Sequence, residues 1–315
     1  MKAPQQLEGT SQEQNNNNNT NYNLQEESDK PCLLCVLIDL STSFLDRLER
    51  FLPKDNSGNR DLLEASALQT FLYELIAFLN LVLISNFSNR IAVFVYNERD
   101  VQVVYEDTSF SAAGTASLWT EERQERSSRL GSQILKNVAD FIDSSSSFAG
   151  VVEIETLFSA ALSFALCYLH RRMQSEKYDA RILCFHASTD VPRQYIGVMN
   201  GIFCAQRCSI LIDVCDLNEE ENSSLLQNAA YLTGGIYFKP QQSESIPLLN
   251  YLCNLYFPNR DARKYFHFPV MPIVDNSALC FESGEKIQIG YVCSVCLATF
   301  GRKRASCRIC GYALE

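Results

Sequence analysis

Residues 32–40 (CLLCVLIDL) form a nearly continuous apolar run that only a buried strand can accommodate. A strand with one wet face alternates apolar and polar residues, whereas a strand covered on both faces reads as an unbroken apolar run. Strands of the second kind belong to parallel sheets with helices on both sides. Cys32 and Cys35 lie three positions apart, so in a strand their side chains point to opposite faces. We therefore expect both cysteines in the core and not in a shared metal site.

Helices and strands alternate along the rest of the chain. The predicted helices cover residues 62–84, 133–143, 155–172, 194–207, 222–232 and 246–255. The predicted strands cover residues 90–96, 101–105, 180–186, 209–214 and 236–238. A polar turn at residues 97–100 joins the first two of these into an antiparallel pair. This order predicts an α/β fold with a doubly wound, mainly parallel sheet and one antiparallel edge strand.

Composition shifts divide the chain into domains. Residues 1–30 are polar, include the run from Asn15 to Asn19, and are expected to be a disordered tail. Residues 31–257 hold the α/β domain, within which residues 107–132 have little apolar periodicity and are expected to be a mobile insertion. Residues 258–289 are expected to be an extended linker, and residues 290–315 a separate unit.

Two closely spaced cysteine pairs in this last unit predict a metal site. Cys293 and Cys296 form one pair, and Cys307 and Cys310 form the other. Two thiolates at this spacing can chelate one ion from a tight turn, and two such turns complete a tetrahedron. Four sulfur ligands with no open position favour structural zinc. The unit is too small to fold by apolar burial alone, so metal binding is expected to supply its folding free energy.

Other interpretations of these cysteines remain. They could be reduced thiols in a disordered tail, or serve an iron–sulfur cluster or redox chemistry. A RING-type ubiquitin ligase would need a second metal site, for which His267 and Cys280 are poor ligands.

A second candidate site follows the first predicted strand. Asp39, Ser41 and Ser43 fit the Asp-x-Ser-x-Ser pattern of a metal-ion-dependent adhesion site, whose oxygens suit Mg²⁺. Open α/β sheets also bind ligands beyond the carboxyl ends of their strands. Such a site needs further oxygen ligands, for which Thr156 and Asp190 are candidates, although Asp190 comes late after its strand. The alternative is that the loop caps the next segment and satisfies backbone amides.

Composition and motifs argue against several functions. The 315-residue chain has a formal net charge of −10, which disfavours broad capture of nucleic acid or anionic membrane. We expect no membrane span, because no run of about 18 residues is free of polar breaks, and no secretory signal. The thirteen cysteines are therefore expected to be mostly reduced. Arg302, Lys303 and Arg304 could touch DNA phosphate, although a short basic run is more often a solvated loop.

No residue pattern indicates catalysis. His170 and His186 lie in no nucleophile or metal-binding motif, and Gly234-Gly235 is not followed by a phosphate-loop lysine. Cys184, Cys204, Cys208 and Cys215 are expected to be small core residues.

The order of segments resembles a von Willebrand A domain joined to a C-terminal four-cysteine zinc module. More narrowly, it resembles the family of small A-domain subunits of general transcription and DNA-repair factor IIH (TFIIH). The segments that carry the resemblance are residues 165–171 (ALCYLHR), 210–213, 225–237 (LLQNAAYLTGGIY) and 289–297 (IGYVCSVCL).

The resemblance implies a non-catalytic architectural role in the nucleus. The A domain of this chain is then expected to pair with the zinc-binding C-terminal region of the larger A-domain subunit. Other core subunits, including the repair helicases, are expected neighbours. This complex serves RNA polymerase II initiation and nucleotide excision repair. Direct DNA contact stays open, and no membrane is expected.

Two departures from the family matter. Members often lack the serines of the metal loop, so Ser41 and Ser43 leave an alternative open, a cation-dependent ligand-binding A domain. The chain ends five residues after Cys310, without the tail that some members carry, which leaves tail-dependent functions open.

Overall fold

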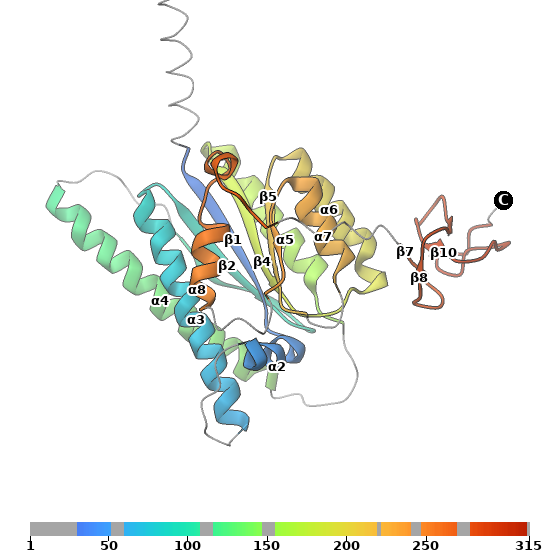
Figure 1. The fold of residues 1–315 in the computed structure, drawn as a ribbon, viewed down its shortest axis with the longest axis horizontal. Helices are drawn as coiled ribbons and strands as arrows, with labels where there is room; N and C mark the ends of the chain where they lie inside the picture. Colours follow the sequence, from blue (N-terminus) through green and yellow to red (C-terminus); the bar gives the residue numbers. More distant parts are fainter. Residues whose placement is uncertain are drawn as a thin grey trace, which may run out of the picture.

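A six-stranded sheet forms the centre of the protein (Figure 1). The computed structural model describes residues 30–51, 60–107, 116–146, 155–218, 222–240, 247–269 and 278–313, so the predicted tail lies outside it except for Lys30. The strands are β1 (Cys32–Asp39), β2 (Arg90–Tyr96), β3 (Val101–Glu106), β4 (Asp179–His186), β5 (Leu211–Asp216) and β6 (Tyr237–Phe238). Their order in the sheet is β3-β2-β1-β4-β5-β6.

The strand directions confirm the predicted fold class. β1 pairs in parallel with β2 on one side and with β4 on the other, with Val36 level with both Val93 and Leu183. β5 and β6 continue the parallel arrangement, whereas β3 pairs antiparallel with β2 at the edge of the sheet. All eight residues of β1 are buried, as its unbroken apolar sequence predicts.

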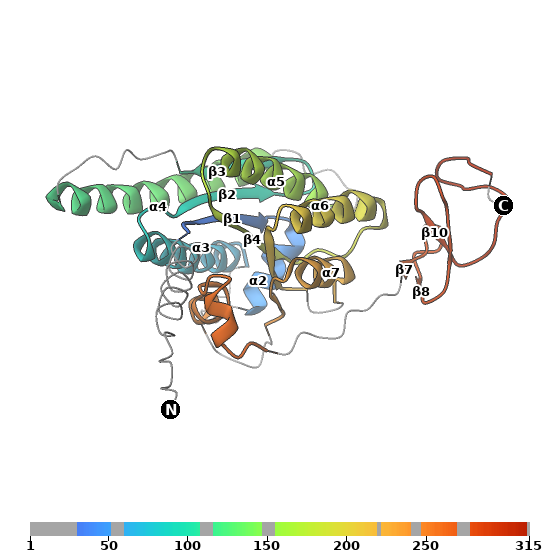
Figure 2. The ribbon, with the colours of Figure 1, turned by 90° about the horizontal axis from the view of Figure 1, so that it is seen from above.

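Helices cover both faces of the sheet (Figure 2). One layer contains α2 (Thr42–Phe51), α3 (Arg60–Ser85), α4 (Ala116–Ser146), α8 (Leu248–Tyr251) and the π-helix η2 (Leu252–Tyr256). The other contains α5 (Phe158–Ser175), α6 (Tyr195–Arg207) and α7 (Ser224–Thr233), with the short 3-10 turn η1 (Pro192–Gln194) before α6. Cys32 packs in the first layer and Cys35 in the second, so both are core residues as expected.

Helix α4 is longer than the sequence predicts. The expected start at residue 133 is wrong, because the helix begins at Ala116 and contains residues 116–132 of the segment that we expected to be an insertion. The reason is a buried charge: Arg126 pairs with Asp107 and donates to the carbonyl oxygen of Phe87 at 2.9 Å. An arginine occupies the inward position one turn before Leu130, so apolar periodicity begins too late to reveal the helix start.

Helix α3 is long and apolar enough to cross a membrane over Ala67–Ser85, by length and composition only. Gln69, Glu74 and Asn80 interrupt its apolar residues, so the expectation that no run of about 18 residues is free of polar breaks holds for this helix. Phe71, Leu75, Phe78 and Leu79 of this helix are buried against the sheet. We interpret α3 as a core helix of the sheet domain. This domain, which contains β1 to β6 and the helices on both faces of the sheet, is called the body below.

The segment predicted as a linker carries regular structure at both of its ends. The 3-10 helix η3 (Ala262–Tyr265) follows the body, and Arg263 from it makes two hydrogen bonds to Asp213 of β5. The hairpin of β7 (Ala278–Leu279) and β8 (Lys286–Ile287) begins a separate unit, residues 278–313, which is called the C-terminal module below. Division of the chain at residues 257 and 289 stays a prediction.

Candidate metal centre

Four cysteines meet in the C-terminal module. Strands β9 (Tyr291–Val292) and β10 (Thr299–Phe300) pair antiparallel and carry the first cysteine pair in the turn between them. The Sγ atoms of Cys293, Cys296, Cys307 and Cys310 all lie within 4.8 Å of one another. Cys293 and Cys310 are 3.7 Å apart at sulfur, and Cys296 and Cys307 are 3.5 Å apart. A zinc–sulfur bond of about 2.3 Å gives sulfurs about 3.8 Å apart in a tetrahedron, so the cluster can hold a metal ion of this size.

The two cysteine turns have the same backbone geometry. The Cys293 amide donates to the carbonyl of Ala298, and the Leu297 amide donates back to the carbonyl of Cys293, both at 2.9 Å. Cys307 repeats this pattern with Tyr312 at 2.7 Å and with Gly311 at 2.9 Å. The residue after each second cysteine has a positive φ, 59° at Leu297 and 74° at Gly311. Gly311 therefore supplies the left-handed conformation that this turn requires.

Backbone amides point at the sulfurs within these turns. Hydrogen bonds from the amides of Cys296 and Val295 lower the pKa of the Cys293 thiol to about 6. A thiolate is the form that ligates metal, so these amides favour the ligand state at Cys293.

A third turn of the same geometry was missed by the sequence reasoning. The Cys280 amide donates to the carbonyl of Glu285 at 2.9 Å, and the Gly284 amide donates to the carbonyl of Cys280 at 2.8 Å. Gly284 has a φ of 70°, as Gly311 has 74°. Ser283 occupies the place of the second cysteine, so this turn offers one thiol and completes no second metal site. A glycine four residues after a lone cysteine was the available signal.

Part of the basic run pairs within the module. Glu282, beside the third turn, forms an ion pair with Arg304 and another with Arg308 at 2.7 Å. Arg304 is therefore engaged with a carboxylate, whereas Arg302 and Lys303 are exposed. Only these last two remain well placed for the phosphate contact that the sequence suggested.

The Asp39 loop lies at the carboxyl end of β1, as predicted. Asp39 and Ser41 are buried, whereas Ser43 is exposed on α2. One carboxylate oxygen of Asp39 accepts a hydrogen bond from the Ser41 amide at 3.0 Å, and the other accepts from the Ser188 hydroxyl at 2.7 Å. The Ser41 hydroxyl oxygen accepts from the Phe44 amide at 3.3 Å, within the first turn of α2. These are the contacts of the capping alternative.

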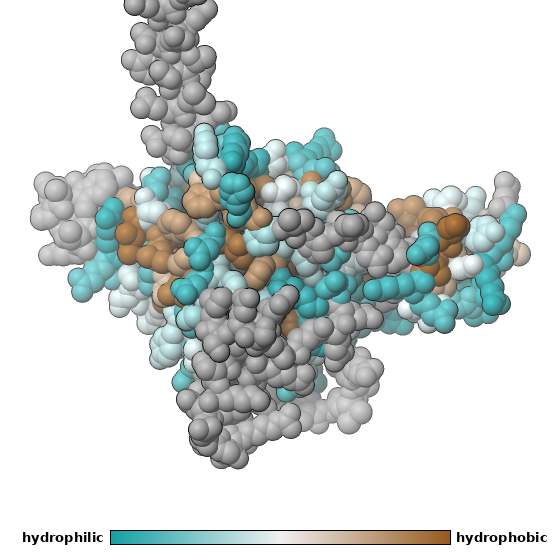
Figure 3. Space-filling model, viewed as in Figure 1, coloured by the Kyte–Doolittle hydropathy of each residue, from teal (hydrophilic) through white to brown (hydrophobic). Residues whose placement is uncertain are grey.

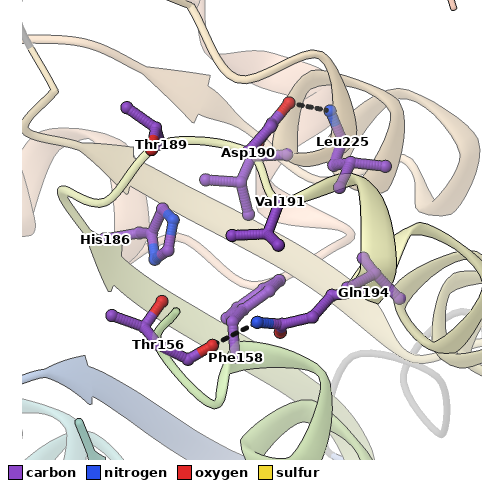
Figure 4. A pocket seen from close by; sticks show the side chains of 10 residues that line it. Thr156, Phe158, His186, Thr189, Asp190, Val191, Gln194 and Leu225 are labelled. Carbon is purple, nitrogen blue, oxygen red and sulfur yellow. Dashed lines mark hydrogen bonds between the residues drawn. The ribbon is translucent and has the colours of Figure 1, made fainter. Parts of the chain in front are cut away.

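Thr156 and Asp190, the two candidates for further oxygen ligands, line a small cavity near the Asp39 loop (Figure 4). Thr156, His186 and Asp190 line it, and its volume of about 20 Å³ admits roughly one water molecule. Asp190 accepts hydrogen bonds from the Ser224 hydroxyl at 3.1 Å and the Leu225 amide at 3.2 Å, at the start of α7. The Thr156 carbonyl accepts from the Gln194 side chain. The Asp190 carboxylate is thus in use within the protein, whereas the bond of Thr156 uses its backbone carbonyl and not its side-chain hydroxyl.

We predict that titration of Mg²⁺ to millimolar concentration gives no saturable heat in calorimetry. Binding would have to replace the hydrogen bonds that the Ser41 amide and the Ser188 hydroxyl donate to the buried Asp39, and Mg²⁺ would also have to lose water that it holds strongly. Asp39→Ala serves as the matched variant. Saturable heat in the native chain that disappears in Asp39→Ala would revive the cation site.

Hydroxyl, imidazole and carboxylate groups around Asp39 form a structural network. His186 Nδ1 lies 2.8 Å from the Tyr96 hydroxyl and 3.4 Å from the Asp39 carboxylate. Ser188 contacts the carboxylate directly and not the imidazole, so the order of a hydrolytic triad is not present in this network. Burial raises the pKa of Tyr96 well above its usual value, which keeps its hydroxyl protonated as a donor.

The buried thiols predicted as core residues are inert. Burial raises the pKa of Cys35 well above its usual value and raises the pKa of Cys215 to about 12. Cys184 is buried as well, whereas Cys204 is exposed and Cys208 is half-buried. The core prediction therefore holds for Cys184 and Cys215 and is wrong for Cys204, which lies on the outer side of α6.

Comparisons with known proteins cover the body and the module together. The family model described as "Transcription factor Tfb4" matches residues 31–311. "General transcription and DNA repair factor IIH subunit TFB4" of Arabidopsis thaliana is 34% identical over 248 residues, covering 76% of this chain and 80% of the relative. The tfb4 subunit of Schizosaccharomyces pombe is 31% identical over 286 residues, covering 91% and 90%.

A solved structure shares the fold. The "TFIIH p34 N-terminal Domain" superposes with a TM-score of 0.54 at 21% identity, covering 71% of this chain and 97% of that one. This confirms the predicted von Willebrand A-like fold of the body.

Proposed function

Because this chain belongs to the transcription factor Tfb4 family, we propose that it is a structural subunit of TFIIH that supports RNA polymerase II transcription initiation and nucleotide excision repair in the nucleus. The extent of the family match supports this most, because it runs from residue 31 to 311 and includes the four-cysteine cluster. The relatives are named as subunits of a transcription and DNA repair factor. The chain acts by assembly and not by catalysis.

The proposed main partner is the larger A-domain subunit of TFIIH. The zinc-binding C-terminal region of that subunit binds the A domain of this chain. The other core subunits, including the repair helicases, are the further neighbours. The body suits such a role, because a rigid sheet with helices on both faces presents fixed surfaces to several chains. Zinc is the proposed ion of the four cysteines, since soft thiolates in a tetrahedral arrangement select it.

The cation-dependent alternative is not favoured by the loop geometry. Both carboxylate oxygens of Asp39 accept hydrogen bonds within the protein, and Ser43 is exposed away from them.

Affinity purification of the tagged full-length chain from nuclear extract tests the proposal. We expect the core TFIIH subunits and both repair helicases to co-elute in fixed ratio and to resist 0.5 M salt, about ten times a low-salt wash, because obligate interfaces are largely apolar. The control is the same tag on an unrelated von Willebrand A domain. Recovery of the tagged chain alone at low salt would contradict the proposal.

A further inference from the structure

The C-terminal module, residues 278–313, exposes more large apolar side chains than it buries. Its interior consists of Ala298, Phe300 and the half-buried Phe281, packed around the thiols. Its surface carries seven large apolar side chains that are each more than half exposed, led by Ile289 at 90%: Ile289, Tyr291, Val292, Val295, Leu297, Ile309 and Tyr312. Single exposed apolar residues are ordinary, but such a concentration on one small unit is typical of a contact surface. Figure 3 shows brown, hydrophobic surface on this module, bordered by teal.

The turn geometry fixes part of this surface rigidly. Val295 is the second residue after Cys293, and Ile309 is the second residue after Cys307, so they occupy equivalent places in two equivalent turns. The sulfurs of both turns lie within 4.8 Å of one another, and therefore both side chains stand close to the same metal centre. A surface that is already ordered loses little conformational entropy on binding.

The chemistry of this surface favours a protein over a nucleic acid. Most of the exposed side chains are aliphatic, whereas single-stranded nucleic acid is bound by aromatic side chains and many cations. The module has five basic residues against two acidic ones, and four thiolates on a divalent ion add two negative charges. Glu282 also occupies Arg304 and Arg308. The electrostatic attraction for phosphate is therefore small.

Two exposed cations of the module indicate the character of the partner. Arg302 and Lys303 follow β10 after Gly301 and are exposed, close in sequence to the apolar turn residue Leu297. Apolar anchors flanked by acidic side chains complement aliphatic residues beside two cations. An amphipathic helix presents such anchors at spacings of three and four residues.

We propose that Val295, Leu297 and Ile309 form a docking surface for an acidic amphipathic helix of another protein chain, whose carboxylates contact Arg302 and Lys303. The proposal rests on the proposed function, because the partner is then a neighbour within TFIIH.

Charge-introducing variants provide the first test, with TFIIH core assembled without this chain as the probe. Val295→Glu with Ile309→Glu should weaken binding of the full-length chain about tenfold or more, as loss of central anchors does. Arg302→Glu with Lys303→Glu should weaken it less and reduce its salt dependence. Gln288→Glu, at an exposed polar residue of the same module, is the matched control and should bind normally. Zinc content must stay at one ion per chain in every variant, and unchanged affinity of the Val295/Ile309 pair would overturn the proposal.

Site-specific photocrosslinking identifies the occupant. With p-benzoylphenylalanine at Val295 or at Ile309, we expect crosslinks in reconstituted TFIIH to one acidic helix of another subunit, which the same probe at Phe203 does not reach. Crosslinks to DNA, to a second copy of this chain or to its own body would overturn the proposal, as would their absence. An assembly that excludes the chain contradicts the proposed function as well, whereas an assembly that contains the chain without these crosslinks contradicts the docking surface alone.

Discussion

Replacing Cys293 with serine should abolish tight zinc binding and unfold residues 278–313, while the body stays folded. The module buries few apolar side chains, so the metal supplies its folding free energy, roughly 10 kcal/mol or more. We expect zinc analysis to give one ion per chain in the native protein and none in Cys293→Ser. Chelation of the native protein should have the same effect, seen as loss of amide-exchange protection in the module only.

Cys280→Ser is the matched control for this experiment. Cys280 lies in a turn with the same hydrogen bonds as the two metal turns, but Ser283 stands where the second thiol would be. We expect this variant to keep one zinc ion and a folded module. Loss of zinc in Cys280→Ser, or retention of zinc in Cys293→Ser, would contradict the four-cysteine site.

Replacing Asp213 with alanine should lower the free energy of unfolding of the body by about 3–5 kcal/mol. Asp213 is buried in β5 and accepts hydrogen bonds from Arg263 at 2.7 and 2.5 Å and from the Ile236 amide at 2.9 Å. The side chain of Arg263 is 9% exposed, so removal of the carboxylate leaves a buried guanidinium without its counter-charge. Urea unfolding followed by fluorescence measures the loss.

Arg260→Ala provides the comparison on the same segment. Arg260 Nε lies 3.7 Å from the Asp179 carboxylate, and its side chain is 40% exposed. Pairs of this kind contribute roughly 0–1 kcal/mol, because solvent screens them. Equal destabilisation by the Asp213 and Arg260 variants would show that burial does not determine the strength of these contacts.

Apolar periodicity was sufficient to predict the body, because its strands and most helices bury continuous or regularly spaced apolar residues. β1 is the clearest case, since every residue from Cys32 to Asp39 is buried. The method failed at α4, where the inward residue is Arg126 and the stabilising contact is an ion pair to Asp107, distant in sequence. Pattern analysis scores such a residue as a surface position, so the helix start was not predictable.

The four-cysteine cluster was predictable because its members are close in sequence. Spacing alone brings Cys293 near Cys296, and Cys307 near Cys310, whatever the rest of the chain does. The Asp39 loop differs, since its contacts with Ser188 depend on how β1 and β4 align. A sequence motif shows which oxygens are present but not which donors already occupy them.

The double burial of β1 has a consequence for how the protein melts. Leu34 and Val36 pack under α3, while Cys35 and Leu37 pack under α5, so neither helical layer can separate without exposing the same central strand. We therefore expect the body to unfold as a single cooperative unit on heating. The C-terminal module has a separate small core, so with zinc as its proposed ion we expect its melting to depend on zinc concentration and not on the strength of that strand.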